Sequence, residues 1–426
     1  MASLLCFTCS SDSGDTTTQS TPTSTPVLSE PPLPSKDERL ASIGDAVSKI
    51  RELPFVDKAD VMFVDAGLLA ETRAKGLENA EVRADIVDSE RLLKLLGLIP
   101  LNSNLLEIEA RLLELSTSGM YDYELGVLQM LDEGDEVSVK QEAVYSHEYA
   151  HLLQDANFDL SELYKSVNGD SDREMALQAL IDGEATFVES TYAMQHISVD
   201  DVTDLVAVDP KDRAVLQATP VFLLLSLNWP YSAGYAFANA TWQHGGMAAL
   251  DAVWRDLPET TEQILHPEKY RANEFSKIPL TLPDLTTILG DGWMVTAEDV
   301  LGEAGISLWL EASGVQNSVA AQAASGWGRD AYAVLTGPNG GSAMGLLIEW
   351  DEPNTDSVEF SSAFEQAMST APMFTKLLNE NVTVDSWDGP AGVLSVALDG
   401  ITGDVGVVVA PTPELAELML TVLVTE

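Results

Sequence analysis

Cysteine and long apolar runs are both scarce in this chain of 426 residues. Its two cysteines, Cys6 and Cys9, lie within the first ten residues. The sequence therefore predicts a folded body without disulfide bonds or thiol chemistry. The most apolar run, residues 221–227, is far shorter than the roughly 20 residues that a membrane-spanning helix needs. We expect no transmembrane segment.

Basic residues are also few. The chain has 22 Lys and Arg against 68 Asp and Glu, which gives a formal net charge of -46. Nucleic acid and anionic membrane surfaces would repel so negative a chain, and we expect neither as a partner. The 45% of hydrophobic residues is ample for real cores. The composition indicates a globular protein, which we expect to be a monomer.

The N-terminal residues are typical of an exported protein. Residues 1–9 resemble the end of an export signal, and Cys6 or Cys9 resembles the lipid-accepting cysteine of bacterial lipoproteins. Residues 10–36 are mostly Ser, Thr, Pro, Gly and Asp, which predicts a disordered stalk. We expect an extracellular or envelope-anchored protein. The alternative is an N-terminus without a signal, because no basic residue precedes the apolar run.

The pattern of apolar residues divides the rest of the chain into two parts, and we expect the α+β fold class. Residues 37–325 are predicted to form a mainly helical domain with a small sheet. Residues 326–426 are predicted to form a separate α+β domain, of the ferredoxin-like type. The predicted helices are 40–53, 81–96, 105–115, 139–155, 173–192, 220–227, 235–254, 355–368 and 413–422. The predicted strands are 61–64, a hairpin within 121–131, 331–335, 344–350, 393–397 and 406–409.

The helix predicted at 139–155 carries a metal-binding motif, because residues 147–151 read His-Glu-Tyr-Ala-His. Two histidines four positions apart share one face of a helix, so His147 and His151 can bind one ion. Zinc lowers the pKa of water to about 7, and Glu148 is placed to accept the proton during attack on a carbonyl. The apolar flanks predict a buried helix, where unpaired histidines would be costly without a metal. The motif predicts hydrolysis that depends on Zn²⁺.

The chain resembles a family of uncharacterised exported bacterial proteins with a gluzincin-type metallopeptidase motif. The family's motif helix reads approximately HExxHALQDQxFDL, and residues 147–160 here read HEYAHLLQDANFDL. Its ligand helix reads ALxEGDAT, and residues 179–186 read ALIDGEAT. The similarity extends over essentially all of the chain after the stalk, including Gly-Trp-Gly-Arg-Asp at 326–330. It implies a zincin-like fold, zinc metallopeptidase activity on a peptide or protein substrate, and an acidic third ligand.

Two acids compete for the third-ligand position. Asp182 and Glu184 are two residues apart on a helix, about 200° around its axis, so only one can face the metal. The apolar neighbours of Glu184 favour a buried carboxylate with zinc as its partner. The small or polar neighbours of Asp182 favour a close approach of the two helices. The family pattern places the ligand at Asp182, where the family has Glu, and we expect Asp182 with Glu184 as the alternative.

Several other residues are candidates for supporting roles. His266 or Tyr270 is expected to hydrogen-bond the developing oxyanion, with a capping or loop role for His266 as the alternative. Asp155 shares the face of His151 and either orients an imidazole or caps the helix. The hairpin within 121–131 precedes the motif helix, where zincins place the strand that pairs with a peptide substrate.

The expected function is zinc-dependent peptide-bond hydrolysis at the cell surface or outside the cell, with Glu148 and His266 as catalytic residues. One alternative is a catalytically inactive zincin-fold lipoprotein that acts as a binding module. Another is a structural envelope protein in which the motif arose by chance. The intact Glu148 favours an enzyme over the inactive module. The C-terminal domain is expected to contribute no metal ligand, because no histidine follows residue 326.

Overall fold

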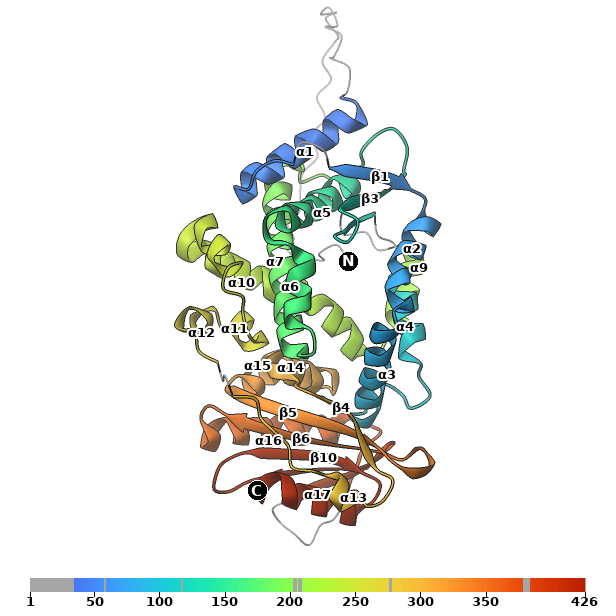
Figure 1. The fold of residues 1–426 in the computed structure, drawn as a ribbon, viewed down its shortest axis with the longest axis vertical. Helices are drawn as coiled ribbons and strands as arrows, with labels where there is room; N and C mark the ends of the chain where they lie inside the picture. The colour runs from blue at the N-terminus through green and yellow to red at the C-terminus, as the bar shows by residue number, and fades with distance from the viewer. Residues whose placement is uncertain are drawn as a thin grey trace, which may run out of the picture.

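The computed structural model describes residues 34–56, 59–115, 118–201, 205, 209–275, 278–377 and 384–425. The expected export signal 1–9, with Cys6 and Cys9, lies outside the described residues, as does most of the expected stalk 10–36. The fold is mixed α+β. A helical region with a small sheet stands above a large antiparallel sheet, as Figure 1 shows.

The helical region contains most of the helices and three of the strands. Its elements are α1 (Lys36–Arg51), β1 (Asp60–Val64), α2 (Ala66–Ala74), η1 (Lys75–Glu78), α3 (Ala80–Leu95), α4 (Leu105–Leu113), β2 (Gly119–Asp122), β3 (Val127–Leu131), α5 (Val139–Phe158), α6 (Leu160–Val167), α7 (Ser171–His196), α9 (Pro210–Ala218), α10 (Val221–Val253), α11 (Thr261–Leu265) and α12 (Pro267–Ala272). The elements at the large sheet are α13 (Thr286–Leu289), β4 (Met294–Asp299), α14 (Gly302–Ala312), α15 (Asn317–Ala324), β5 (Trp327–Thr336), η2 (Pro338–Gly340), β6 (Ser342–Trp350), α16 (Pro353–Thr370), β7 (Thr375–Lys376), β8 (Val384–Gly389), β9 (Gly392–Leu398), β10 (Val405–Ala410) and α17 (Pro413–Thr425).

The small sheet has the order β1-β3-β2, with β1 parallel and β2 antiparallel to the central strand β3. The hairpin expected within 121–131 is therefore confirmed. Strand β2 lies at an edge of this sheet and contacts α5. This packing brings the backbone of an edge strand next to the helix that carries the motif.

Helix α5 begins with a capping box, in which Ser138 and Gln141 satisfy each other's backbone N–H groups. Helix α7 lies beside α5 and crosses α10 at the glycine pair Gly183 and Gly234. A Cβ atom on Gly183 would lie 2.1 Å from the carbonyl carbon of Gly234, so only glycine allows this crossing. The glycine after Asp182 thus serves the packing of α7 on α10.

The sequence predicted two helices, 220–227 and 235–254, where the structure has the single element α10. Pro230 lies inside α10, and non-helical backbone angles occur only later, at Gly245 and Gly246. Proline lacks the N–H that would donate to the carbonyl of Ser226, yet the helical backbone continues past Pro230.

The large sheet has the order β4-β5-β6-β10-β9-β8-β7, and all of its pairings are antiparallel. The ferredoxin-like prediction is wrong, because that motif alternates as β-α-β-β-α-β, whereas this sheet joins β7 to β10 as a continuous meander. Strand β4 also precedes the boundary expected at residue 326. The sheet packs with α14, α15 and α16 on one face and with α13 and α17 on the other, and Leu280 and Leu282 join the second core, so this unit begins well before residue 326.

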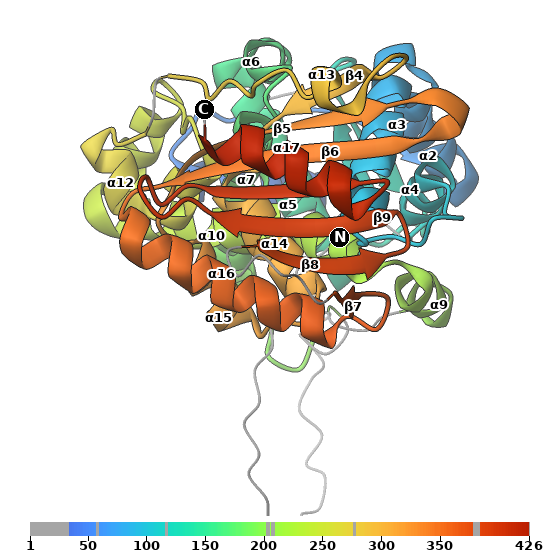
Figure 2. The ribbon, with the colours of Figure 1, turned by 90° about the horizontal axis from the view of Figure 1, so that it is seen from below.

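Helices cover both faces of the large sheet. One face packs against α14, α15 and α16 and against α3 of the helical region. The other face packs against α17, which crosses it in the view of Figure 2. Alternate residues of β10 serve the two cores, with Val407 in the first and Val408 in the second. In the described part of the chain, no helix combines the length and the apolar character that spanning a membrane requires.

Candidate metal centre

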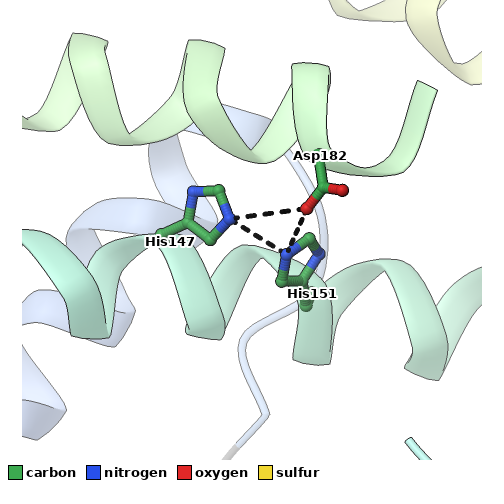
Figure 3. Close-up of side chains that lie close together, drawn as sticks. All are labelled: His147, His151 and Asp182. Atoms are coloured by element: carbon green, nitrogen blue, oxygen red, sulfur yellow. Dashed lines mark hydrogen bonds and ion pairs between the residues drawn. The ribbon is translucent and has the colours of Figure 1, made fainter. Parts of the chain in front are cut away.

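Helices α5 and α7 bring His147, His151 and Asp182 together, as Figure 3 shows. The two histidines lie on one face of α5, and their Nε2 atoms are 3.0 Å apart. Asp182 faces them from α7, with its Oδ1 atom 3.4 Å from His151 Nε2 and 3.9 Å from His147 Nε2. Within the described ranges this is the one group of His, Cys, Asp and Glu side chains with metal-ligand spacing. We call these three residues the metal cluster.

Neighbouring side chains fix the tautomers of both imidazoles. The Nδ1 atom of His147 lies 3.1 Å from Oε2 of Glu189, and the Nδ1 atom of His151 lies 2.8 Å from Oε1 of Gln154. Both partners are oxygen acceptors, so each imidazole donates from Nδ1 and keeps the lone pair on Nε2 in its neutral form. The two lone pairs are therefore directed toward the space shared with Asp182.

The orientation of the Gln154 amide follows from its other contacts. Its Nε2 atom donates to the carbonyl of Ile181 at 3.0 Å and lies 3.4 Å from Oε1 of Glu184. Both of these atoms are acceptors, so the amide nitrogen must face them and the amide oxygen must face His151. Gln154 is buried, which leaves this arrangement little freedom. The backbone of α7 thereby sets the tautomer of a histidine on α5.

The pKa values of His147 and Asp182 are both shifted by the other members of the metal cluster. Burial alone would lower the pKa of His147, but its hydrogen bonds with Asp182 and Glu189 raise that pKa to about 10. Burial opposes ionisation of Asp182, yet hydrogen bonds from His147 and His151 hold the pKa of Asp182 well below its usual range. Both shifts have one cause, which is that three converging acceptors require a positive charge between them. A divalent cation supplies that charge with the histidines neutral.

Glu184 lies in different surroundings and is not a member of the metal cluster. Its Oε1 atom is 2.7 Å from Nε of Arg51, and its Oε2 atom accepts a hydrogen bond from Nε1 of Trp254 at 2.8 Å. Both charged side chains are 1% exposed. The expectation that Glu184 could be a metal ligand is wrong, because Arg51 already neutralises it on the far side of α7. Asp182 is the acid that faces the histidines.

Glu148 lies beside the metal cluster and contacts the edge strand. Its Oε2 atom accepts a hydrogen bond from the backbone N–H of Tyr121 on β2 at 2.7 Å. Glu148 also lines a pocket of about 220 Å³ together with the cluster residues. We call this space the cluster pocket. Its lining also includes Arg73, Met120, Tyr121, Tyr123, Tyr164, Gln178 and Tyr231.

The structure places His266 and Tyr270 away from the cluster pocket. His266 pairs through Nε2 with Oε1 of Glu303 at 2.9 Å and lines a different cavity, between α10, α11, α14 and α15. Tyr270 donates its hydroxyl to the carbonyl of Asp256 at 2.7 Å. The expectation of an oxyanion role for either residue is wrong, because neither lines the pocket of Glu148. His266 instead occupies the turn between α11 and α12 as the N-cap of the latter.

Asp155 caps a helix end and does not orient an imidazole, which were the two roles expected for it. Its Oδ1 atom accepts from the backbone N–H of Leu160 at 3.0 Å, where α5 ends and α6 begins. Its Oδ2 atom accepts from the hydroxyl of Tyr121 at 2.7 Å, so it also ties α5 to β2. The residues that do orient the imidazoles, Gln154 and Glu189, were missed. Helical spacing could have found them, since Gln154 is three residues after His151 and Glu189 is seven after Asp182.

Comparison with known protein families finds a match over part of the chain. A family model described as a domain of unknown function (DUF8575) matches residues 293–419. This segment begins next to β4 and ends within α17, so it coincides with the large sheet and its helices. It contains no residue of the metal cluster. No curated protein and no solved structure matches the chain.

Proposed function

We propose that this chain is a zinc-dependent peptidase, with His147, His151 and Asp182 as the metal ligands and Glu148 as the general base. The observation that carries the proposal is the convergence of two Nε2 lone pairs, each fixed by a partner at Nδ1, on one buried carboxylate oxygen. A chance motif on a surface helix would have no reason to fix both tautomers.

The cluster residues fit zinc by their number and chemical type. Two imidazoles and one carboxylate are the protein ligands of a common class of catalytic zinc site, which keeps one position open for water or substrate. Partners such as Gln154 and Glu189 raise the basicity of zinc-binding histidines and fix their rings. When bound, zinc supplies Lewis acidity that polarises a carbonyl and acidifies water. Zinc peptidases commonly use two histidines and a glutamate, and Asp182 takes the place of the glutamate here.

In this proposal, residues around the metal cluster transfer the proton and bind the substrate. Glu148 is held by the N–H of Tyr121 and lines the cluster pocket, where it can accept a proton and later return it to the leaving amine. Strand β2 lies at the edge of its sheet next to this pocket, a position in which zinc peptidases pair a strand with extended substrate. We include in this proposal a zincin-like fold and export of the protein with a lipid anchor at Cys6 or Cys9. Both rest on the sequence motifs.

The test combines metal analysis of the purified protein with cleavage of a peptide library, with and without a chelator. We expect about one zinc per chain and cleavage that the chelator abolishes. Glu148→Gln should keep zinc but lower hydrolysis by about 10²- to 10⁴-fold, because an amide cannot accept a proton. His147→Ala should lose the metal itself. The exposed Glu136→Gln, just before α5, is the matched control and should behave as wild type.

Each part of the proposal can fail separately. A zinc-free protein that cannot be loaded would remove the metal centre. Zinc without cleavage of any peptide would favour the catalytically inactive binding module instead. Wild-type turnover in Glu148→Gln would show that another group accepts the proton.

A further inference from the structure

Arg73 is the one arginine or lysine that lines the cluster pocket, where the other charged groups besides the histidines are Glu148 and Asp182. It lies in the last turn of α2, whereas the metal cluster lies on α5 and α7. Figure 1 shows α2 at the right of the helical region, apart from these two helices in its middle. In a chain with a net charge of -46, a cation at this place is a distinctive feature.

Backbone carbonyls position the Arg73 guanidinium. Its NH1 atom donates to the carbonyls of Leu113 at 2.8 Å and Leu115 at 3.2 Å, at the end of α4. In the described part of the chain, no carboxylate forms a salt bridge with it, whereas the buried Arg51 is paired with two acids. Burial lowers the pKa of Arg73, and the nearby Tyr231 and Glu148 offset part of that decrease. The guanidinium stays charged at physiological pH.

We propose that Arg73 binds the C-terminal carboxylate of the substrate, so that the chain removes residues from the C-terminus of peptides. The inference rests on the proposed function and names its substrate class. An arginine fork matches a carboxylate in shape and charge, and the carbonyls leave the rest of this fork for such a partner. Glu148 repels a carboxylate placed beside it. The C-terminal carboxylate is also the one acidic group that every peptide carries next to its last peptide bond.

The size of the cluster pocket agrees with this assignment. Its volume of about 220 Å³ is below the roughly 300–1,000 Å³ of pockets that enclose drug-sized ligands. This volume suits a single terminal residue, and both the metal cluster and Arg73 line the pocket. Tyr231 lies in the same pocket, with its ring centroid 6.0 Å from that of His147. The competing role for Arg73 is stabilisation of the oxyanion, which would act on every substrate alike.

The experiment compares matched peptides that differ only at the C-terminus, a free acid and its amide. We expect the wild-type protein to prefer the acid by about 10- to 100-fold in kcat/KM, the effect of a charge-assisted hydrogen bond. Arg73→Gln should raise KM for the acid and bring the acid-to-amide ratio close to one. Arg111→Gln is the matched control, because Arg111 lies on α4 and only forms an exposed pair with Glu107. Equal cleavage of both peptides by the wild type overturns the proposal, as does an Arg73→Gln variant with an unchanged ratio.

A binding measurement separates this inference from the proposed function. N-acetylphenylalanine and its amide are titrated into the Glu148→Gln protein. This measurement of binding does not depend on turnover. Tighter binding of the acid, lost when Arg73→Gln is added, supports the carboxylate site even if no peptide is ever cleaved. Failure of the acid to bind better than the amide overturns the site, whatever the hydrolysis assays give.

Discussion

Two buried acids on α7, only two residues apart, lie in opposite electrostatic surroundings. Asp182 faces two imidazole lone pairs, so the space beside it contains acceptors and lacks a cation. Glu184 faces Arg51 and the indole N–H of Trp254, so its charge is matched by donors from the chain itself. The difference shows that burial of an acid does not identify a metal ligand. What identifies it is a set of acceptors whose charge the protein leaves unbalanced.

Gln154 connects the two surroundings. It donates to Glu184 and to the carbonyl of Ile181, and it accepts from His151. Arg51 thus positions Glu184, Glu184 helps to orient the Gln154 amide, and that amide fixes the ring of His151. Under the proposed function, zinc binding should therefore depend directly on Asp182 and only indirectly on Glu184.

The largest expected effect comes from exchanging the two acids for alanine. Asp182→Ala should lose zinc during dialysis, and hydrolysis with it, because two histidines alone do not complete the site. Glu184→Ala should keep zinc but lose about 3 kcal/mol or more of stability, since it leaves the buried Arg51 charge without its main partner. Zinc content and thermal unfolding of both variants provide the measurement. Loss of zinc in Glu184→Ala alone would reverse the assignment.

A smaller effect is expected at Gln154. Gln154→Leu should weaken zinc binding by about 10- to 100-fold, because the ring of His151 loses the acceptor that fixes its tautomer. Gln141→Leu is a matched control on the same helix, since Gln141 is equally buried and donates to the carbonyl of Leu131 at 2.6 Å. Competition with a chelating dye measures both affinities. Equal weakening by the two variants would mean that Gln154 acts only through the stability of α5.

The parts of this structure that the sequence predicted are those that local patterns determine. The motif and the apolar periodicity of residues 139–155 predicted the helix α5 and the placement of His147 and His151 on one of its faces. The choice of Asp182 over Glu184 agrees with the geometry, because Asp182 faces both imidazoles. Glu184 was kept as a candidate because its apolar neighbours were visible, whereas its partner Arg51 lies 133 residues away in the sequence.

Long-range pairing explains the other errors. The strands β4, β7 and β8, at or next to the edges of the large sheet, were not predicted. Their apolar patterns are weak, because β4 and β8 are partly exposed and β7 has two residues. The Gly-Trp-Gly-Arg-Asp segment had no predicted role, and the structure gives it one. Asp330 accepts from the backbone N–H groups of Leu301 and Gly302 and from the indole of Trp327. This carboxylate fixes the start of α14 to the large sheet, a contact that no local pattern reveals.

A third buried acid extends the comparison, because it has neutral donors and no cation. Asp172, near the start of α7, accepts from the backbone N–H of Thr261 at 3.1 Å and from its hydroxyl at 2.5 Å. Its surroundings also include the acids Asp330 and Asp170. Burial raises the pKa of Asp172 to about 8. The negative charges of Asp330 and Asp170 raise this pKa further, whereas the hydrogen bonds from Thr261 lower it. Asp172 thus shows what becomes of a buried acid that neither a metal nor an arginine neutralises.

The smallest expected effect is therefore a pH dependence at Asp172. A pKa raised from 3.8 means that the folded state keeps a proton that the unfolded state has released. Stability from this group is full below pH 4 and falls as the pH rises toward 8, by up to about 1.4 kcal/mol per pH unit. Asp172→Asn keeps an acceptor for Thr261 and removes the titration, so its urea-unfolding free energy should fall less than that of wild type between pH 6 and pH 7. The exposed Asp291→Asn should follow wild type. If Asp172→Asn also follows wild type, the carboxylate is ionised in the folded state and the donors of Thr261 suffice to hold its charge.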